Sequence, residues 1–315
     1  MTHDYSFGGL RIRSDIALPG LAEAGWGQGA APELRLTAEI GAPPPFDRVW
    51  YQWHQGYRLQ LGERDGRWLI RSRFDGSFLI DRDGSALHLM AHTLPPAPEV
   101  IEVLLRRVLT RVPVMHGATA IHAASLACDG GSALLIGRSG AGKSTLCASL
   151  ALHGGWQILG DDTALLWTPQ APMLGAGARS VCLWPESHDG LGVPSARSEP
   201  LASATGKTRS PIEQKDPPPR VPLSAVFFLD RSADAPAPRL ERLSVADAVS
   251  LAVPQIIHFN PHGESAQERI DAVLGITQAL RIRPAWRLIY PNSYAALPQV
   301  EALLRPLLAC AAPPA

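Results

Sequence analysis

Cysteine is scarce in this sequence. The chain of 315 residues contains four, and no two of them form a C-x-x-C pair. No group of cysteines and histidines has the spacing of a zinc site either. These absences argue against zinc binding, and we expect reduced, buried thiols. The four residues are Cys128, Cys147, Cys182 and Cys310.

An excess of either charge is also absent. Lysine and arginine total 29, and aspartate and glutamate total 29 as well. A neutral balance provides no global basic field, so the composition argues against a nucleic-acid partner.

Long apolar runs are missing. No run approaches the roughly 18 to 20 apolar residues that span a bilayer. Residues 1–15 lack the charged-then-apolar plan of a signal peptide. We therefore predict a cytoplasmic protein that makes no contact with a membrane.

The chain does have the apolar content for a substantial core, because 46% of its residues are hydrophobic. Its length fits one large or two medium domains. Residues 1–94 are predicted to form a β-rich N-terminal domain, in which short alternating runs are separated by Asp-Gly turns. We expect an antiparallel meander with a role in substrate recognition. The three turns lie at 64–67, 74–77 and 82–85.

A proline-rich stretch at 95–98 marks the boundary of this domain. Residues 99–112 follow, with apolar side chains at helical spacing, and they predict an amphipathic helix. Its three arginines are expected on a solvated face: Arg106, Arg107 and Arg111.

Residues 95–315 are predicted to form an α/β domain, because strand and helix patterns alternate from residue 120 onward. The runs at 120–128 and 132–137 are expected strands, and 223–231 is an expected buried strand. Three helices are expected nearer the C-terminus, and two of them have serine N-caps, Ser244 and Ser265.

The segment GRSGAGKS, residues 137–144, fits the pattern G-x-x-x-x-G-K-[ST] at every position. Glycines let main-chain N–H groups converge on phosphate oxygens, and the following helix N-terminus adds partial positive charge. Lys143 is expected to reach the β- and γ-phosphates, and Ser144 to ligate Mg²⁺. The predicted nucleotide-binding residues are Gly137, Ser139, Gly140, Ala141, Gly142, Lys143, Ser144 and Thr145.

A pair of aspartates follows this loop closely. Asp161 comes 18 residues after Lys143, which leaves room for one helix, a tight turn and one strand. We therefore expect Asp161 and Asp162 beside the phosphates. One carboxylate can hold Mg²⁺, and the other can accept the proton of an attacking hydroxyl. The alternative is an aspartate pair that only forms a turn.

The order of these segments resembles that of the HPr kinase/phosphorylase family. The matching stretches are IHAASL (121–126), GRSGAGKS (137–144) and GDD (160–162). The chain is most similar to the HPr-kinase-like kinases that phosphorylate the C-terminal serine of lasso peptide precursors. The resemblance implies a P-loop kinase domain of the HPr kinase type, with a mixed sheet and flanking helices, behind a β-rich N-terminal domain.

The resemblance also implies roles for individual residues. Lys143 and Ser144 become the phosphate and magnesium residues, Asp161 the catalytic base, and Asp162 a residue beside the metal. His122 occupies the position of the family's histidine, on the strand before the loop. ATP and Mg²⁺ are the implied cofactors, and a homo-oligomer is the implied assembly.

Two departures argue against HPr itself as the substrate. Thr145 stands where HPr kinases usually have glutamate, and the predicted N-terminal meander differs from their N-terminal α/β unit.

A basic, proline-rich stretch spans residues 206–220. It can be a solvated surface loop, or a lid that supplies a cation to the transferring γ-phosphoryl group. The candidate cations, in order of preference, are Lys207, Arg209 and Lys215.

Together these features predict an ATP-dependent kinase that acts on a serine hydroxyl of a peptide or protein, with a lasso precursor peptide as the preferred acceptor. Three alternatives stay open: a nucleotide-dependent hydrolase or switch, a kinase of a different hydroxyl, and an inactive peptide-binding accessory. The early aspartate pair and the lack of an N-K-x-D motif argue against the switch.

Overall fold

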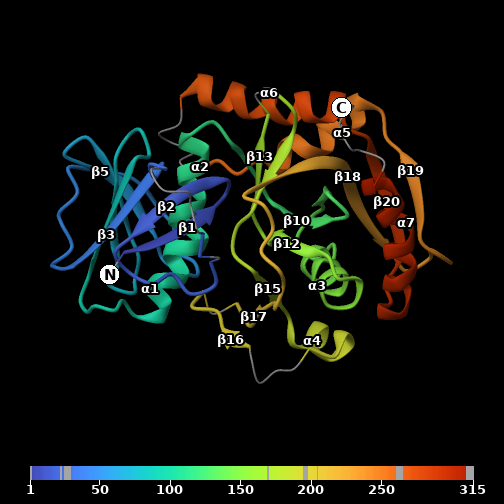
Figure 1. The fold of residues 1–315 in the computed structure, drawn as a ribbon, viewed down its shortest axis with the longest axis horizontal. Coiled ribbons are helices and arrows are strands. Elements are labelled where there is room, and N and C mark those ends of the chain that lie inside the picture. Colours follow the sequence, from blue (N-terminus) through green and yellow to red (C-terminus); the bar gives the residue numbers. More distant parts are fainter. Residues whose placement is uncertain are drawn as a thin grey trace.

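The computed structural model describes residues 2–21, 23–24, 30–168, 170–193, 198–203, 205–259 and 265–309. The fold is mixed α/β. It contains an eight-stranded sheet, a nine-stranded sheet and a small three-stranded sheet. Figure 1 shows the first sheet at one end of the molecule and the second sheet, with most of the helices, at the other.

The eight-stranded sheet is built from the N-terminal part of the chain. Its last five strands form the expected antiparallel meander, and the three Asp-Gly turns connect the four strands β5 to β8 as predicted. In sheet order the strands are β1 (His3–Phe7), β2 (Leu10–Ser14), β3 (Leu34–Ile40), β8 (Ala86–Ala91), β7 (Ser77–Ile80), β6 (Arg67–Arg71), β5 (Gln60–Arg64) and β4 (Arg48–Gln52).

The expectation of a wholly antiparallel sheet is wrong, because β3 runs parallel to both of its neighbours, β2 and β8. Parallel neighbours need a long crossover connection. The connection between β2 and β3, residues 15–33, is long enough for such a crossover. The Asp-Gly turns predicted the pairing and direction only of those strands that short turns join.

A helical segment follows the sheet. It starts with α1 (Pro98–Val103), continues through a π-helical turn, η1 (Leu104–Val108), and a 3₁₀ turn, η2 (Leu109–Arg111), and ends with α2 (Val112–Met115). The predicted helix is therefore confirmed, but its regular α geometry is not.

This segment lies between the two large sheets (Figure 1). Its apolar side chains share one core with N-terminal strands and with Leu165 and Trp167 of the second sheet. The expectation of a fully solvated arginine face is wrong, since Arg111 is only 7% exposed. A helix packed on both sides has little solvated surface to offer.

The nine-stranded sheet contains the long strand β18 (Arg220–Ser232), which includes the predicted buried strand. β18 pairs in parallel with β11 and β20, and antiparallel with β14. The other strands are β12 (Gln157–Gly160), β10 (Ala123–Cys128), β11 (Gly131–Ile136), β14 (Met173–Gly175), β13 (Ala164–Trp167), β9 (Thr119–Ile121), β20 (Ala285–Pro291) and β19 (Arg239–Arg242).

Helices cover both faces of this sheet. α3 (Lys143–Gly154) and α7 (Leu297–Ala309) share an apolar core on one face. α5 (Val245–Ala252) and α6 (Ala266–Ile282) share another on the opposite face. Both predicted caps are confirmed: Ser244 and Ser265 accept main-chain N–H bonds, and Ser265 forms a capping box with Glu268.

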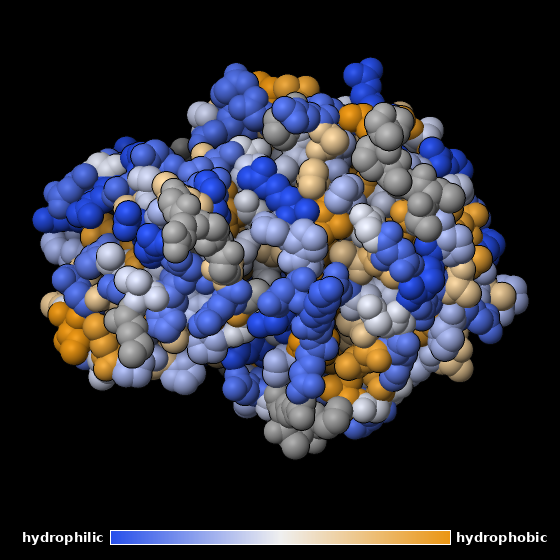
Figure 2. All heavy atoms as spheres, in the orientation of Figure 1, coloured by the Kyte–Doolittle hydropathy of each residue, from blue (hydrophilic) through white to orange (hydrophobic). Residues whose placement is uncertain are grey.

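The small sheet lies near the start of α3. It contains β15 (Ser180–Leu183), β17 (Thr208–Pro211) and β16 (Glu199–Pro200), and the short helix α4 (Pro185–Leu191) follows β15. The face in Figure 2 is largely hydrophilic, and its apolar side chains gather in separate patches.

Three of the cysteines, Cys128, Cys147 and Cys182, are free and buried as expected, and Cys310 lies outside the described residues. Among the described helices, none is both long and apolar enough to cross a membrane.

Candidate active site

The segment 137–144 joins the end of β11 to the start of α3. Gly140 and Gly142 have φ angles of +81° and +91°, which side chains rarely adopt. A Cβ on Gly142 would also lie 2.7 Å from the hydroxyl oxygen of Tyr290. Both positions therefore need glycine, and the tip of the loop, which includes Ser139, is exposed.

The loop is held by two side chains from neighbouring strands. Arg231 Nη2 donates to Gly140 O at 3.0 Å, and Tyr290 Oη donates to Ala141 O at 3.0 Å. Burial raises the pKa of Tyr290 to about 12, so its hydroxyl remains a donor at neutral pH. These contacts hold two carbonyl groups of the loop in place.

The first turn of α3 has no side-chain cap, because its N-cap residue is Gly142. The N–H groups of a first helical turn have no intrahelical partners. Together with the helix dipole, they favour an anion at this end of the helix.

Lys143 lies under the loop and is 7% exposed. Its Nζ donates to Gly137 O at 2.7 Å and to Arg138 O at 3.3 Å, and it lies 3.1 Å from His122 Nε2. Burial lowers the pKa of Lys143, while Asp162 and Asp161 oppose this shift. The ammonium group therefore lies between two carbonyl oxygens of the loop and the His122 ring.

Ser144 contacts the first aspartate of the pair. Its Oγ donates to Asp161 Oδ1 at 2.9 Å, and Cys182 N donates to Asp161 Oδ2 at 2.8 Å. Burial raises the pKa of Asp161, and these two hydrogen bonds oppose that shift. Asp161 thus lies directly beside the hydroxyl that the sequence predicts as a magnesium ligand. Next to Ser144, Thr145 Oγ1 lies 3.0 Å from Ser187 Oγ of α4.

Asp162 lies among basic side chains. Its Oδ1 is 3.2 Å from His122 Nδ1, and its Oδ2 is 3.4 Å from Arg106 Nη2 and 3.9 Å from Arg107 Nη2. Burial works to raise the pKa of Asp162, but the hydrogen bond from His122 and the charges of Arg106 and Arg107 outweigh burial and lower it. Its carboxyl group is therefore ionised at neutral pH.

His122 connects the lysine to this carboxylate. Its Nδ1 lies 3.0 Å from Asp162 O, and its Nε2 faces the Lys143 ammonium group, which can only donate. With these partners, Nδ1 is placed to donate to Asp162 and Nε2 to accept from Lys143.

Both strands that lead into the site break at the same level. The sequence favoured a single strand over 120–128, but the chain leaves the sheet at His122, whose N–H donates to Gln255 O at 2.7 Å. Asp161 and Asp162 fall in the equivalent break between β12 and β13, and Asp162 has a φ of +77°. These breaks direct His122 and the aspartates toward the loop.

Arg106 and Arg107 were missed as site residues by reasoning from the sequence. They lie on the π-helical turn η1, a geometry that is frequent at functional sites. The sequence did contain an indication that these arginines are buried, because apolar residues occur on more than one side of this helix. Arginines on such a helix must lie between buried surfaces.

The basic stretch is more ordered than a surface loop. Residues 208–211 form the strand β17, which pairs with β15. The Gln214 side chain forms two hydrogen bonds with the main chain of Ile158, at 2.8 and 3.0 Å. The expectation of a loop is therefore wrong for residues 208–211, and the role of the stretch as a lid stays a prediction.

The three candidate cations of this stretch have different surroundings. Lys207 Nζ lies 5.6 Å from the ring centre of Trp184, and its charge contributes to the lowered pKa of Lys143. Arg209 forms an ion pair with Glu199. Lys215 is exposed. Of the three, Lys207 is the one whose charge acts on the loop lysine.

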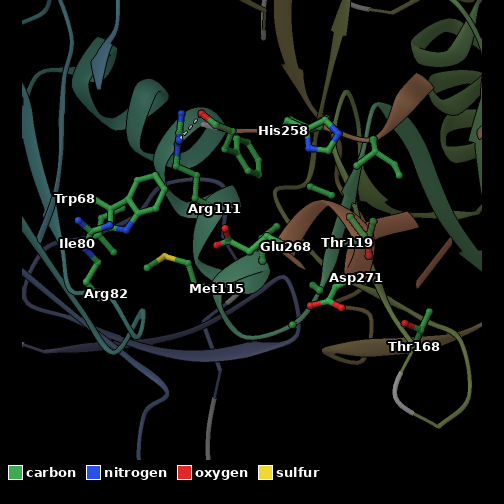
Figure 3. Close-up of a pocket in the computed structure, with 18 residues that line it drawn as sticks. Trp68, Ile80, Arg82, Arg111, Met115, Thr119, Thr168, His258, Glu268 and Asp271 are labelled. Atoms are coloured by element: carbon green, nitrogen blue, oxygen red, sulfur yellow. Dashed lines mark hydrogen bonds between the residues drawn. The ribbon is translucent and has the colours of Figure 1, made fainter. Parts of the chain in front are cut away.

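A larger cavity, of about 550 Å³, lies elsewhere, between the N-terminal sheet and the start of α6. Figure 3 shows Arg111 and Glu268 among its lining residues. Arg111 donates to Phe259 O at 2.9 Å, and Glu268 belongs to the capping box of α6. None of its described lining residues belongs to the predicted site, whereas a cavity of about 50 Å³ is lined by Arg106, Asp161 and Asp162.

No protein-family model and no curated protein matches the sequence. Among solved structures, the chain aligns with the Hpr(Ser) kinase/phosphatase from Coxiella burnetii. The identity is 14%, the alignment covers 59% of this chain and 94% of that chain, and the TM-score is 0.31. At these values the alignment supports no conclusion about chemistry, which has to come from the residues of the site.

Proposed function

We propose that this protein is an ATP-dependent kinase that transfers the γ-phosphoryl group to a hydroxyl acceptor. The observation that carries the proposal is the hydrogen bond of 2.9 Å between Ser144 and Asp161, beside the glycine loop that covers Lys143. P-loop enzymes use this combination of loop, lysine, hydroxyl and strand-end aspartate to hold the phosphates and their metal ion.

The side chains fit a magnesium ion. Ser144 and Asp161 supply hard oxygen donors, and among the described residues no cluster of three His, Cys, Asp or Glu side chains could hold a metal by itself. Mg²⁺ suits such a site, because it usually takes one or two protein ligands together with substrate phosphates and water. When bound, Mg²⁺ would neutralise the charge that develops on the phosphoryl oxygens.

Asp162 is our candidate for the group that orients the acceptor hydroxyl and takes its proton. It is ionised, it is only partly buried, and His122 holds it from one side. A weak base suffices here, because phosphoryl transfer depends mainly on positioning and charge stabilisation. This assignment exchanges the roles that the sequence suggested, since Asp161 is the carboxylate beside Ser144.

The remaining parts of the proposal concern recognition. Residues 95–315 would form the catalytic domain and residues 1–94 would contribute to acceptor binding. Lys207 is the preferred additional cation for the transferring group, ahead of Arg209, which is paired with Glu199, and of Lys215. Serine in a peptide is the proposed acceptor, and the C-terminal serine of a lasso precursor is preferred on the family resemblance alone.

The test is the intact mass of a lasso precursor peptide after incubation with the protein, ATP and Mg²⁺. We expect the mass of one or more phosphates to be added, and Lys143→Ala to abolish the gain while the variant remains folded. Hydrolysis of ATP without phosphate on this peptide or on other serine peptides would instead favour the hydrolase or switch.

A further inference from the structure

The edge of the N-terminal sheet contains a basic cavity of about 290 Å³. It is formed by the hairpin that joins β4 to β5 and by the residues after β6. All of the titratable side chains that line it are basic: His54, Arg58, Arg71 and Arg73. No aspartate or glutamate is among its described lining residues.

The charges of these arginines are not neutralised. Arg71 donates to Pro44 O, and Arg73 Nη2 donates to Ala202 O at 3.0 Å. A carbonyl oxygen satisfies one N–H group but leaves the positive charge in place. Within the described part of the chain, no carboxylate forms an ion pair with Arg58, Arg71 or Arg73. The Nε of Arg71 is buried without a partner. Converging cations of this kind favour an anionic ligand.

The cavity is linked to the candidate active site by side-chain contacts. Trp53 lines the cavity, and its ring centre lies 5.4 Å from the guanidinium carbon of Arg107. Arg107 reaches Asp162 in turn, at 3.9 Å. Two adjoining side chains thus lead from the basic cavity to the carboxylate proposed to orient the acceptor.

The wall between the two sites is held by buried contacts. The ring centre of Tyr57 also lies 5.3 Å from the guanidinium carbon of Arg107, and the Tyr57 hydroxyl donates to Glu102 at 2.6 Å. The second oxygen of Glu102 accepts from Ala202 N at 3.0 Å. Glu102 is therefore occupied by the wall itself and does not neutralise the cavity.

We propose that this cavity binds carboxylate side chains of the acceptor, so that the substrate is a peptide with Asp or Glu near its acceptor hydroxyl. Trp53, which is 39% exposed at the rim, offers an aromatic surface for the peptide between the cavity and Asp162. The peptide's role as acceptor rests on the proposed kinase function, whereas its binding to the cavity does not.

The test measures binding without nucleotide, by fluorescence anisotropy. Two labelled peptides share one serine and one sequence, except that glutamates in the first are glutamines in the second. We expect the glutamate peptide to bind at least tenfold more tightly, and added salt to reduce this difference. Equal affinities, or no binding of the glutamate peptide up to about 1 mM, would overturn the proposal.

The matched variants are Arg58→Glu/Arg73→Glu and, as control, Arg35→Glu/Arg281→Glu, whose exposed arginines lie outside the cavity. The first should lose at least tenfold in affinity for the glutamate peptide, and the control should not. Both should bind a fluorescent ATP analogue as the unmodified protein does, which shows that they fold. Equal affinities in the two variants would contradict the proposal.

Two further outcomes separate the inference from its rivals. Tighter binding of a single-stranded oligonucleotide than of the glutamate peptide, through the same arginines, would overturn it. Binding of the glutamate peptide through Arg58 and Arg73 without phosphate transfer would support the inference and would count against the proposed kinase function for this peptide.

Discussion

Two basic clusters in this protein hold their charges in different ways. Arg106 and Arg107 face Asp162, and Arg106 also contacts Cys182. Arg71 and Arg73, in the cavity at the sheet edge, donate to main-chain carbonyls and lie over the rings of Phe46 and Phe74. The first cluster is paired with a carboxylate of the protein, whereas no carboxylate of the described residues forms an ion pair with the second.

The two clusters are therefore expected to have different roles: the paired arginines orient groups within the site, and the unpaired arginines bind a ligand. Charges that are paired within the fold orient one another, and their loss is expected to reduce both stability and activity. Charges without a counterion remain available to a ligand, and their loss is expected to affect binding alone. The predictions that follow test this contrast in order of decreasing effect.

The largest effect is expected at the aspartate pair. Asp162→Asn should lower kcat for phosphoryl transfer by about 10²-fold or more, the usual contribution of a positioned base, and leave the affinity for Mg²⁺·ATP unchanged. Asp161→Asn should weaken Mg²⁺ binding, because Asp161 shares a hydrogen bond with Ser144. Steady-state kinetics at varied Mg²⁺ measure both effects. The reverse pattern would restore the roles suggested by the sequence.

The next effect concerns the paired arginine. Arg106→Met should lower the free energy of unfolding by about 1–2 kcal/mol, because Asp162 loses a charged hydrogen-bond donor. Arg73→Met, at the unpaired cluster, should change it by less than about 0.5 kcal/mol. Urea denaturation of the two variants provides the comparison. Equal losses would show that the pairing seen here has no energetic consequence.

The two aspartates should also differ in their pH dependence. The pKa of Asp162 is lowered by folding from 3.8, so its stabilisation is complete above pH 3.8 and is lost as the pH falls below that value. The pKa of Asp161 is raised by folding, so its ionisation destabilises the fold at neutral pH, and that penalty disappears as the pH falls toward 3.8.

The measurement is the free energy of unfolding between pH 7 and about pH 3. Relative to the unmodified protein, Asp162→Asn should lose less stability on acidification, and Asp161→Asn should lose more. Identical profiles for the two variants would contradict the opposite shifts.

The smallest expected difference in stability lies between alanine variants of two glycines with left-handed backbones. Gly66 has a φ of +72° and no atom within 4 Å of an added Cβ, so Gly66→Ala should cost about 1 kcal/mol of stability and leave activity unchanged. Gly142→Ala should cost about 2 kcal/mol, because it also displaces the Tyr290 hydroxyl, and should impair nucleotide binding. Thermal unfolding and nucleotide titration test this order.

Local patterns predicted a large part of the fold. The Asp-Gly turns placed the N-terminal hairpins, and serines at Ser244 and Ser265 placed two helix starts, because each signal acts within a few residues. The parallel pairing of β3 was not predictable in this way, since it depends on contacts between strands far apart in the chain.

The candidate site divides along the same line. The sequence by itself determined the glycine loop with Lys143 and Ser144, and placed two aspartates a fixed distance beyond it, because these residues act through spacing along one strand–loop–helix unit.

Only the tertiary structure decided which aspartate meets Ser144, which one meets His122, and that Arg106 and Arg107 lie beside them. The physical reason is that these contacts join a helix and two broken strands through the packing of both large sheets. The sequence pattern of a single segment cannot predict contacts between segments that lie far apart in the chain.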